Sequence, residues 1–218
     1  TKKFKIVILS DSKSWINSTV EVLSADWKQL GHEVFWLHDL HELPTANLCF
    51  CLSFSKILKK EIRDLFDHTL VVHASDLPAG KGWSPLSWQI LEGKNQIPVC
   101  LFEADDSVDS GPIYAQRHIN FEGHELIDSL RKKLAEITYE LCSWFVAEYP
   151  RSSSHPKMQK GNESFYSRRG PKDSQLDVNK TIAEQFNLLR IVDNQAYPAF
   201  FEWKGRRFVL TIAEDGCV

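Results

Sequence analysis

Glycine is scarce in this chain and is missing where nucleotide-binding folds require it. Only 10 of the 218 residues are glycine, and none lies between the first apolar run, Ile6–Leu9, and Trp15. The GxGxxG fingerprint and the P-loop both need glycine in that first turn, because the backbone must approach a diphosphate closely. Both patterns are absent, which argues against a dinucleotide-dependent dehydrogenase and an NTPase. The GxSxG elbow of the α/β-hydrolases is absent as well.

An excess of positive charge is also missing. The chain has 26 Lys and Arg against 29 Asp and Glu, a net charge of −3 and a pI near 6.2. A protein that binds RNA or DNA through its phosphates normally presents a basic face, so we expect no nucleic-acid partner. The basic stretches Lys56–Arg63 and Lys204–Arg207 are interpreted as solvated faces.

Cysteine usage and hydropathy indicate the compartment. The five cysteines are odd in number and have no Cys-x-x-Cys spacing, which favours free thiols in a reducing compartment over a disulfide framework. They are Cys49, Cys51, Cys100, Cys142 and Cys217. The run Ile6–Leu9 is too short for an export signal or a membrane span. We therefore expect a cytoplasmic protein with no membrane partner.

Apolar patterns predict alternating strands and helices. Strands are expected at 5–10, 33–37, 48–53, 69–73, 98–104 and 113–121. Helices are expected at 15–30, 56–66, 84–91 and 126–148, with Gly31 ending the first and Ser84 capping the third. This alternation predicts an α/β fold with a Rossmann-like, mostly parallel sheet and helices on both faces.

The chain after residue 150 changes character. Residues 150–163 are polar and are predicted to form a linker. A helix at 181–191 and a hairpin at 198–212, turning at Lys204-Gly205, are expected to follow. The predicted organisation is a catalytic domain at 1–150, followed by a linker and a small C-terminal helix-hairpin extension at 151–218.

Two residues suggest acyl transfer to an amine. His73 ends an expected strand, and Asp109 lies 36 residues later in a loop. An imidazole can polarise a formyl oxygen, and a carboxylate can accept the proton that an attacking amine loses. Taken singly, His73 would more often be a satisfied histidine at a strand end, and Asp109 an ordinary turn residue.

The surrounding motifs resemble those of the folate-dependent formyltransferases. Their pattern is Asn-x-His-Pro-Ser-Leu-Leu-Pro, a basic-Gly turn, a helix and then Asp-x-Gly. Over roughly residues 4–148, this chain matches it with His73, Ser75, Leu77-Pro78, Lys81-Gly82 and Asp109-Ser110-Gly111. The resemblance implies the formyltransferase fold, N10-formyltetrahydrofolate as co-substrate, catalysis by His73 and Asp109, and no metal.

One departure concerns the asparagine two places before the histidine, which is Val71 here. Valine cannot donate a hydrogen bond to the formyl oxygen, and the loss of one oxyanion donor typically lowers the rate by about 10²–10³-fold. Ser75 is the side chain named as a replacement donor, with a backbone N–H as another candidate. Alternatively, Ser75 has a structural role and stabilises the turn by hydrogen bonding to nearby backbone groups.

The same resemblance assigns the folate site. Ser53–Leu58 is similar to the family loop that holds the pterin. The residues expected to bind the co-substrate are Ser55, Ile57, Leu58, Asp105, Asp106 and Val108.

The tail resembles that of sugar-nucleotide formyltransferases, in particular the pseudaminic-acid-pathway type. The similar segments are Phe165–Ser174, Phe186–Arg190 and Tyr197–Phe201. This implies that the acceptor is a UDP- or dTDP-linked amino-deoxy sugar used in surface-glycan biosynthesis. The residues expected to bind it are Lys81, Arg168, Arg169, Arg190, Tyr197 and Phe200. The exposed hairpin is compatible with a homodimer.

Alternatives remain at this level. The chain could instead be a formyltetrahydrofolate hydrolase, although water as acceptor needs no docking tail. It could also be a catalytically weak module that binds folate or a nucleotide sugar, which Val71 favours. The tail arginines could form structural ion pairs, the tail aromatics could be hairpin core, and Lys81 could be a solvated turn lysine.

Overall fold

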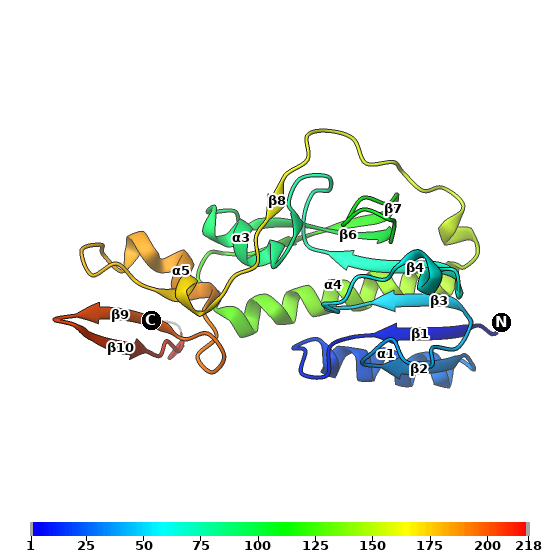
Figure 1. Cartoon of the computed structure of the whole chain (residues 1–218), viewed down its shortest axis with the longest axis horizontal. Helices are drawn as coiled ribbons and strands as arrows, with labels where there is room; N and C mark the ends of the chain where they lie inside the picture. Colours follow the sequence, from blue (N-terminus) through cyan, green and yellow to red (C-terminus); the bar gives the residue numbers. More distant parts are fainter. Residues whose placement is uncertain (1, 217–218) are drawn as a thin grey trace.

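A six-stranded sheet forms the centre of the molecule (Figure 1). The computed structural model describes residues 2–216, so Cys217 lies outside the description. The strand order is β2-β1-β3-β4-β6-β7. The bounds are β1 (Lys5–Leu9), β2 (Glu33–Leu37), β3 (Ala46–Cys51), β4 (Phe66–His73), β6 (Gln96–Glu103) and β7 (Ile113–Asn120). Strands β1 to β4 run parallel to one another, and β6 pairs antiparallel with both of its neighbours, β4 and β7. The predicted mostly parallel α/β sheet is confirmed.

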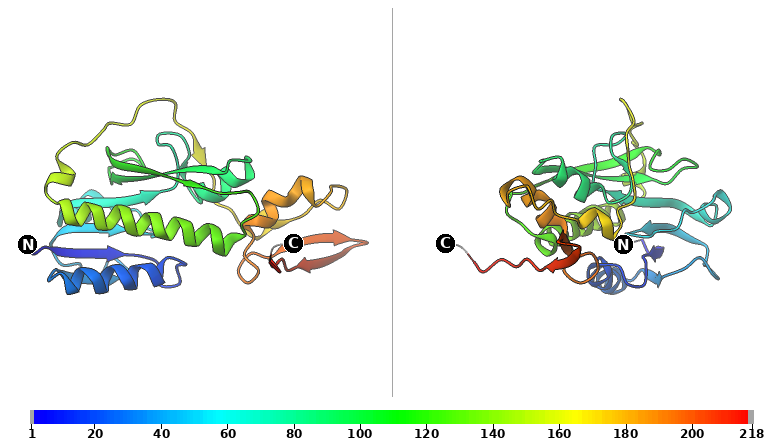
Figure 2. Two further views of the ribbon diagram at one scale, coloured as in Figure 1. Left: turned by 180° about the vertical axis from the view of Figure 1, so that it is seen from behind. Right: turned by 60° about the vertical axis from the view of Figure 1, so that its left-hand side comes forward.

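One face of the sheet is thickly covered. Alternate side chains of β1 and β3, such as Ile6 and Phe50, point to this face and are fully buried. They pack beneath α1 (Asn17–Gln29) and the long helix α4 (Ile127–Glu148), which cross the face in the left panel of Figure 2. Helix α3 (Pro85–Leu91) adds to the same cluster. The periodicity that predicted α1 and α4 therefore reflects a real apolar stripe on each helix.

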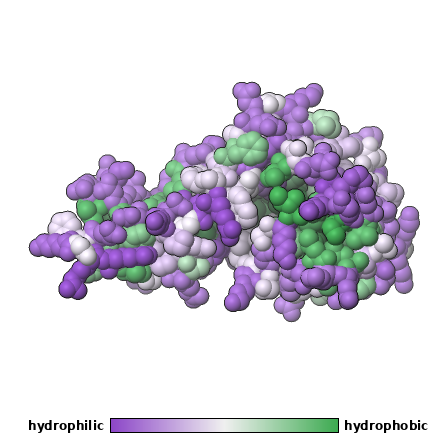
Figure 3. All heavy atoms as spheres, viewed as in Figure 1, coloured by the Kyte–Doolittle hydropathy of each residue, from purple (hydrophilic) through white to green (hydrophobic). Residues whose placement is uncertain are grey.

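The opposite face is thinly covered. Its cluster is built on Val7, Leu9, Cys49 and Cys51 and is closed mainly by loops. Within residues 2–216, the helix that contributes to this cluster is α2 (Lys60–Arg63), which has four residues, so the predicted helix over 56–66 is wrong in length. Residue 66 is already needed as the buried first position of β4, which leaves room for a single helical turn. Apolar surface is visible over this part of the molecule in Figure 3.

The start of α3 also differs from the prediction. Ser84 has φ 49° and makes no capping hydrogen bond through its side chain. The helix begins instead with Pro85 in its first turn, where a missing backbone N–H costs nothing. Gly31, with φ 91°, follows α1 as expected.

The C-terminal extension lies beyond the end of the sheet (Figure 1). It contains two 3-10 turns, η2 (Pro171–Ser174) and η3 (Ala183–Gln185), the helix α5 (Phe186–Ile191) and a hairpin of β9 (Ala199–Trp203) and β10 (Arg206–Leu210). A further 3-10 turn, η1 (Arg151–Ser153), directly follows α4 and lies against it at the other end of the molecule (Figure 1). The predicted turn at Lys204-Gly205 is confirmed by positive φ at both residues. The predicted helix at 181–191 is divided into η3 and α5.

The segment before the extension is attached to the body. The short strand β8 (Phe165–Tyr166) pairs in parallel with β5 (Lys81–Gly82). A further bridge joins Lys157 to Ile113 at the start of β7. The stretch predicted as a linker thus runs along two loops of the body, the one that follows His73 and the one that contains Asp109. Across residues 2–216, no helix combines the length and hydropathy needed to span a membrane.

Candidate active site

His73 lies at the carboxyl end of β4 and faces Asp109. Its Nε2 is 2.8 Å from the carbonyl oxygen of Gly80. A carbonyl only accepts, so Nε2 carries a proton and donates it. The other nitrogen, Nδ1, is 3.7 Å from Oδ2 of Asp109. Two residues far apart in sequence are therefore brought together, and Nδ1 is the nitrogen available to a reacting group.

Asp109 is held in an unusual conformation. Its φ is 50°, in the left-handed region that non-glycine residues seldom occupy. Its Oδ2 accepts a 2.8 Å hydrogen bond from the backbone N–H of Gly82. A Cβ at Gly82 would lie 2.6 Å from the carbonyl oxygen of Tyr166, so glycine is required there. The carboxylate is thus fixed beside His73 with its second oxygen available.

Gln159 supports the Asp109 loop from outside the sheet. Its Nε2 donates to the carbonyl oxygens of Asp109 at 2.8 Å and Gly111 at 2.9 Å. Gln159 was not predicted, because a polar side chain in a polar stretch gives no sign of a contact with a backbone 50 residues away. Close packing of the loop adds to its order, since a Cβ on Gly111 would collide with the carbonyl of Glu103.

Lys81 is not free to bind a ligand in this structure. The residue is 1% exposed. Its Nζ donates to Ser110 Oγ at 2.8 Å and forms an ion pair with Glu163 at 2.7 Å. These contacts tie the Asp109 loop to the segment before β8, which favours a positioning role over the predicted contact with substrate. Glu163 was also missed, for the same reason as Gln159.

Ser75 lies two residues after His73 and has a buried hydroxyl. The residue is 1% exposed, and its Oγ has no hydrogen-bond partner within residues 2–216. Val71 precedes His73 by two residues on the same strand face and packs against apolar neighbours that include Cys51 and Phe102. The site therefore has no amide at the Val71 position but does have a spare buried donor at Ser75.

The two loops predicted to hold folate lie against each other. Arg63 donates to the carbonyl of Leu58 at 2.8 Å and forms an ion pair with Asp106. Its side chain is only 13% exposed, so its assignment to a solvated face was wrong. The apolar side chains of Ile57 and Val108 are 69% and 45% exposed. Arg63 therefore braces two loops that present uncovered apolar groups.

The other two residues predicted for folate make short-range contacts. The N–H and Oγ of Ser55 both donate to Asp11, at 3.2 and 3.1 Å. Asp105 accepts from the N–H of Asp106 at 2.7 Å. These contacts shape the two loops and leave their outer surface open.

The tail residues fall into two groups. Arg190 is 1% exposed, and its guanidinium contacts Glu125 at 3.3 Å and Asn95 at 2.9 Å. Burial lowers the pKa of Arg190, which the neighbouring Glu125 partly offsets. Phe200 is buried beneath Arg207, whereas Tyr197 is partly exposed. Arg190 and Phe200 therefore stabilise the extension and are not presented to a ligand.

The paired arginines beside β8 differ from Arg190. Arg168 is exposed and lies over Trp83. Arg169 is half-buried, lies over Trp88 and donates to the carbonyl of Asp173 at 2.8 Å. Of the three arginines predicted to bind the acceptor, Arg168 is the one that is exposed to solvent.

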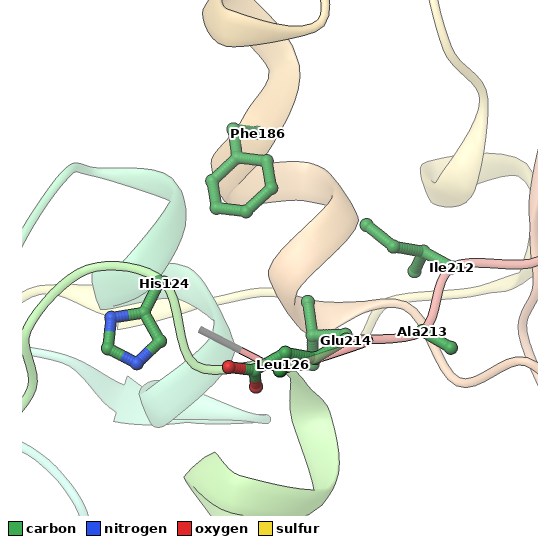
Figure 4. A pocket seen from close by; sticks show the side chains of 7 residues that line it. His124, Leu126, Phe186, Ile212, Ala213 and Glu214 are labelled. Atoms are coloured by element: carbon green, nitrogen blue, oxygen red, sulfur yellow. The ribbon is translucent and has the colours of Figure 1, made fainter. Parts of the chain in front are cut away.

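A separate apolar hollow joins the extension to the body (Figure 4). It has a volume of about 330 Å³ and is lined by His124, Leu126, Phe186, Ile212 and neighbouring tail residues. Neither His73 nor Asp109 lines it. Across residues 2–216, no group of three or more His, Cys, Asp or Glu is arranged to hold a metal ion.

Comparison with known proteins gives the family. Residues 6–145 match the sequence profile described as formyl transferase. A methionyl-tRNA formyltransferase from Thermodesulfovibrio yellowstonii is 28% identical over 140 residues, covering 64% of this chain and 46% of the relative. The chain thus spans about half the length of the curated relatives it matches.

Solved structures share the fold. A sugar N-formyltransferase from a Shewanella species has a TM-score of 0.74 and 13% identity, covering 98% of this chain and 99% of that one. HypX from Aquifex aeolicus, in complex with tetrahydrofolic acid, has a TM-score of 0.80 and 19% identity, covering 94% and 36%. The formyltransferase PseJ from Anoxybacillus kamchatkensis, in complex with UDP-4,6-dideoxy-4-formamido-L-AltNAc and tetrahydrofolate, has a TM-score of 0.60 and 20% identity, covering 74% and 85%.

Proposed function

Because the chain belongs to the formyl transferase family, we propose that it transfers the formyl group of N10-formyltetrahydrofolate to the amine of a nucleotide-linked amino-deoxy sugar. The observation that carries this proposal is the pairing of His73 Nδ1 with the Asp109 carboxylate at 3.7 Å. The fold is compatible with a sugar acceptor, because a sugar N-formyltransferase from a Shewanella species shares it over nearly its whole length. The net charge of −3 speaks against a tRNA acceptor.

The chemistry follows from the positions of the side chains. N10-formyltetrahydrofolate supplies the formyl carbon. Asp109 accepts the proton that the amine loses on attack, and it can return that proton to the departing nitrogen. Protonated at Nδ1, His73 donates to the oxyanion that forms on the formyl oxygen, and the unpartnered hydroxyl of Ser75 is the second donor in place of the missing amide. Holding the reactants in place supplies much of the acceleration.

The folate loops fit this role by their composition and geometry. Ile57 and Val108 offer apolar surface for a pterin, and the backbone of Ser55 to Leu58 and of Asp105 to Val108 offers polar groups for its edges. Arg63 fixes the separation of the two loops through Leu58 and Asp106. We expect these loops to bind the co-substrate before the acceptor enters.

The test is an acceptor panel. Purified protein is incubated with N10-formyltetrahydrofolate and UDP- or dTDP-linked amino sugars, including the amine corresponding to the formamido sugar in the PseJ complex, and tetrahydrofolate release is followed. Methionyl-tRNA is included as a competing acceptor. Release that requires one sugar supports the proposal. Release with water alone indicates a hydrolase, release with tRNA identifies the other acceptor class, and binding of folate without release indicates a non-catalytic module.

We also propose a cytoplasmic homodimer for this enzyme, joined through the hairpin. Trp203, Phe208 and Val209 are 54%, 43% and 60% exposed, and a hairpin with such a surface favours pairing with another chain. Light scattering should show twice the monomer mass, and Phe208→Glu should shift the mass to that of a monomer.

A further inference from the structure

An exposed tryptophan lies one residue after the backbone N–H that holds the Asp109 carboxylate. Trp83 follows Gly82, whose N–H holds Asp109, and it is 41% exposed. The backbone N–H of Trp83 donates to the carbonyl oxygen of Tyr166 at 3.1 Å. The paired β5 and β8 therefore fix the backbone of Trp83 relative to Asp109.

Arg168 lies on this tryptophan and has free hydrogen-bonding capacity. Its Cζ is 4.8 Å from the centroid of the indole. Within residues 2–216, its guanidinium has no ion pair or hydrogen bond, in contrast to Arg169 and Arg190. A guanidinium that lies on an aromatic ring keeps its N–H groups directed outward in a fork, the arrangement that suits a phosphate.

The residues just before Arg168 are held by contacts with α3 and Glu92, which follows it. The ring of Trp88 stacks on Tyr166 at 5.8 Å and 7°, and its Nε1 donates to the carbonyl of Ser167 at 2.9 Å. The hydroxyl of Tyr166 donates to Glu92. The backbone that leads into Arg168 is thus anchored to α3, so little ordering cost remains when a ligand binds.

We propose that Trp83 and Arg168 form the acceptor subsite, in which Arg168 binds the diphosphate and the exposed part of the indole packs against the hexose. This deepens the proposed function and rests on it. An amine placed between His73 and Asp109 puts its sugar ring over the residue next to Gly82, and the diphosphate then extends toward Arg168. The subsite takes the place of Arg190 and Phe200, which are buried.

The test distinguishes the diphosphate contact from the hexose contact by comparing ligands with and without the hexose. UDP and dTDP, which lack the hexose, are titrated calorimetrically, and the KM is measured for the amino-sugar nucleotide that the panel selects. Arg168→Ala should weaken the better-binding diphosphate by about 10- to 100-fold, and Arg168→Lys should fall between, because lysine lacks the fork. Trp83→Ala should raise the KM about tenfold and change the diphosphate affinity less than about threefold. Val22→Ala on α1 and Arg117→Ala on β7, both exposed residues outside the hairpin, serve as controls.

Three outcomes decide between the ideas. If the wild type is active and both subsite variants keep its KM and affinity, the subsite is wrong while the transferase stands. If neither UDP nor dTDP binds the wild type, the subsite is wrong as well. If no amino sugar supports release, yet Arg168→Ala still abolishes binding of the diphosphate, the diphosphate contact stands and the proposed transfer fails.

Discussion

Arginine and aromatic side chains occur together in two regions of this molecule, with opposite consequences. Beside β5 and β8, Arg168 lies exposed on Trp83. In the C-terminal extension, Arg190 is buried against Glu125, and Phe200 lies under Arg207. The residue types are the same, but Arg190 of the extension is already paired with Glu125 and Asn95 of the body, and Phe200 is covered by Arg207. A group that has already found its partner inside the protein stabilises the fold, whereas a fixed group without one is available to a ligand.

The largest expected effect comes from the catalytic pair, where polar groups face an open site. His73→Ala and Asp109→Asn should each lower kcat by about 10³-fold or more, because each removes a group that acts in the transition state. Tetrahydrofolate release measures this, and the melting temperature should show that the variants fold. Asp128→Asn, on the exposed first turn of α4, is the control. A decrease of less than about tenfold in Asp109→Asn would remove Asp109 from the chemistry.

The matching experiment in the extension is Arg190→Ala. It removes one of the two cations that pair with Glu125, Lys133 being the other, and leaves the buried acceptors of Arg190 without a donor, so the free energy of unfolding should fall by about 1–3 kcal/mol. The KM of the folded fraction for the acceptor should stay unchanged. Urea denaturation and steady-state kinetics check the two parts. A raised KM with unchanged stability would return Arg190 to the binding site and erase the contrast between the regions.

The pH dependence of stability should show that Glu125, the partner of Arg190, has a structural role. Burial raises the pKa of Glu125, but hydrogen bonds from the backbone around Glu122 and Gly123 and from Lys133 outweigh it and lower the pKa to about 2. Because the folded-state value lies below the unfolded one, this stabilisation is complete above about pH 4.5 and is lost as the pH falls toward 2. The loss should be about 3 kcal/mol, and Glu125→Gln should remove this part of the pH dependence. Denaturation at several pH values tests it; equal slopes in both proteins would contradict the assignment.

A smaller effect is expected at Gln159, which belongs to the active region but does not touch the reacting atoms. Gln159→Ala should lower kcat about tenfold with little change in the folate KM, since Asp109 loses its backbone support. Gln159→Glu should be worse, because a carboxylate would face two carbonyl oxygens. The exposed Gln175→Ala is the control. A change in KM alone would indicate that the residue acts on binding and not on Asp109.

The smallest effect is expected at Tyr197. It is exposed, but it lies on the extension just before β9, whereas the proposed acceptor subsite is carried by the paired β5 and β8. Tyr197→Ala should therefore change the acceptor KM by no more than about twofold. An increase of tenfold would show that the extension takes part in recognition after all.

Local patterns predicted what local physics determines. Apolar periodicity located α1, α4 and the strands, and motif spacing brought His73 and Asp109 together. The sequence did not reveal the shortening of α2, the left-handed Ser84 or the contacts of Gln159 and Lys81. These depend on where a distant segment lies, and a polar residue has the same propensity whether it is solvated or bonded to a backbone 50 residues away.

The β5–β8 pairing has a consequence for the order of assembly during synthesis. The sheet can close once β7 and α4 have left the ribosome, but the Asp109 loop then still lacks Gln159, and Gly82 lacks its neighbour Tyr166. Domains generally fold as their segments emerge, and contacts between distant segments form late. A nascent chain with residues 1–150 outside the ribosome would have a formed core but an incomplete active site, so the ability to react arises only after residues 159–166 have also emerged.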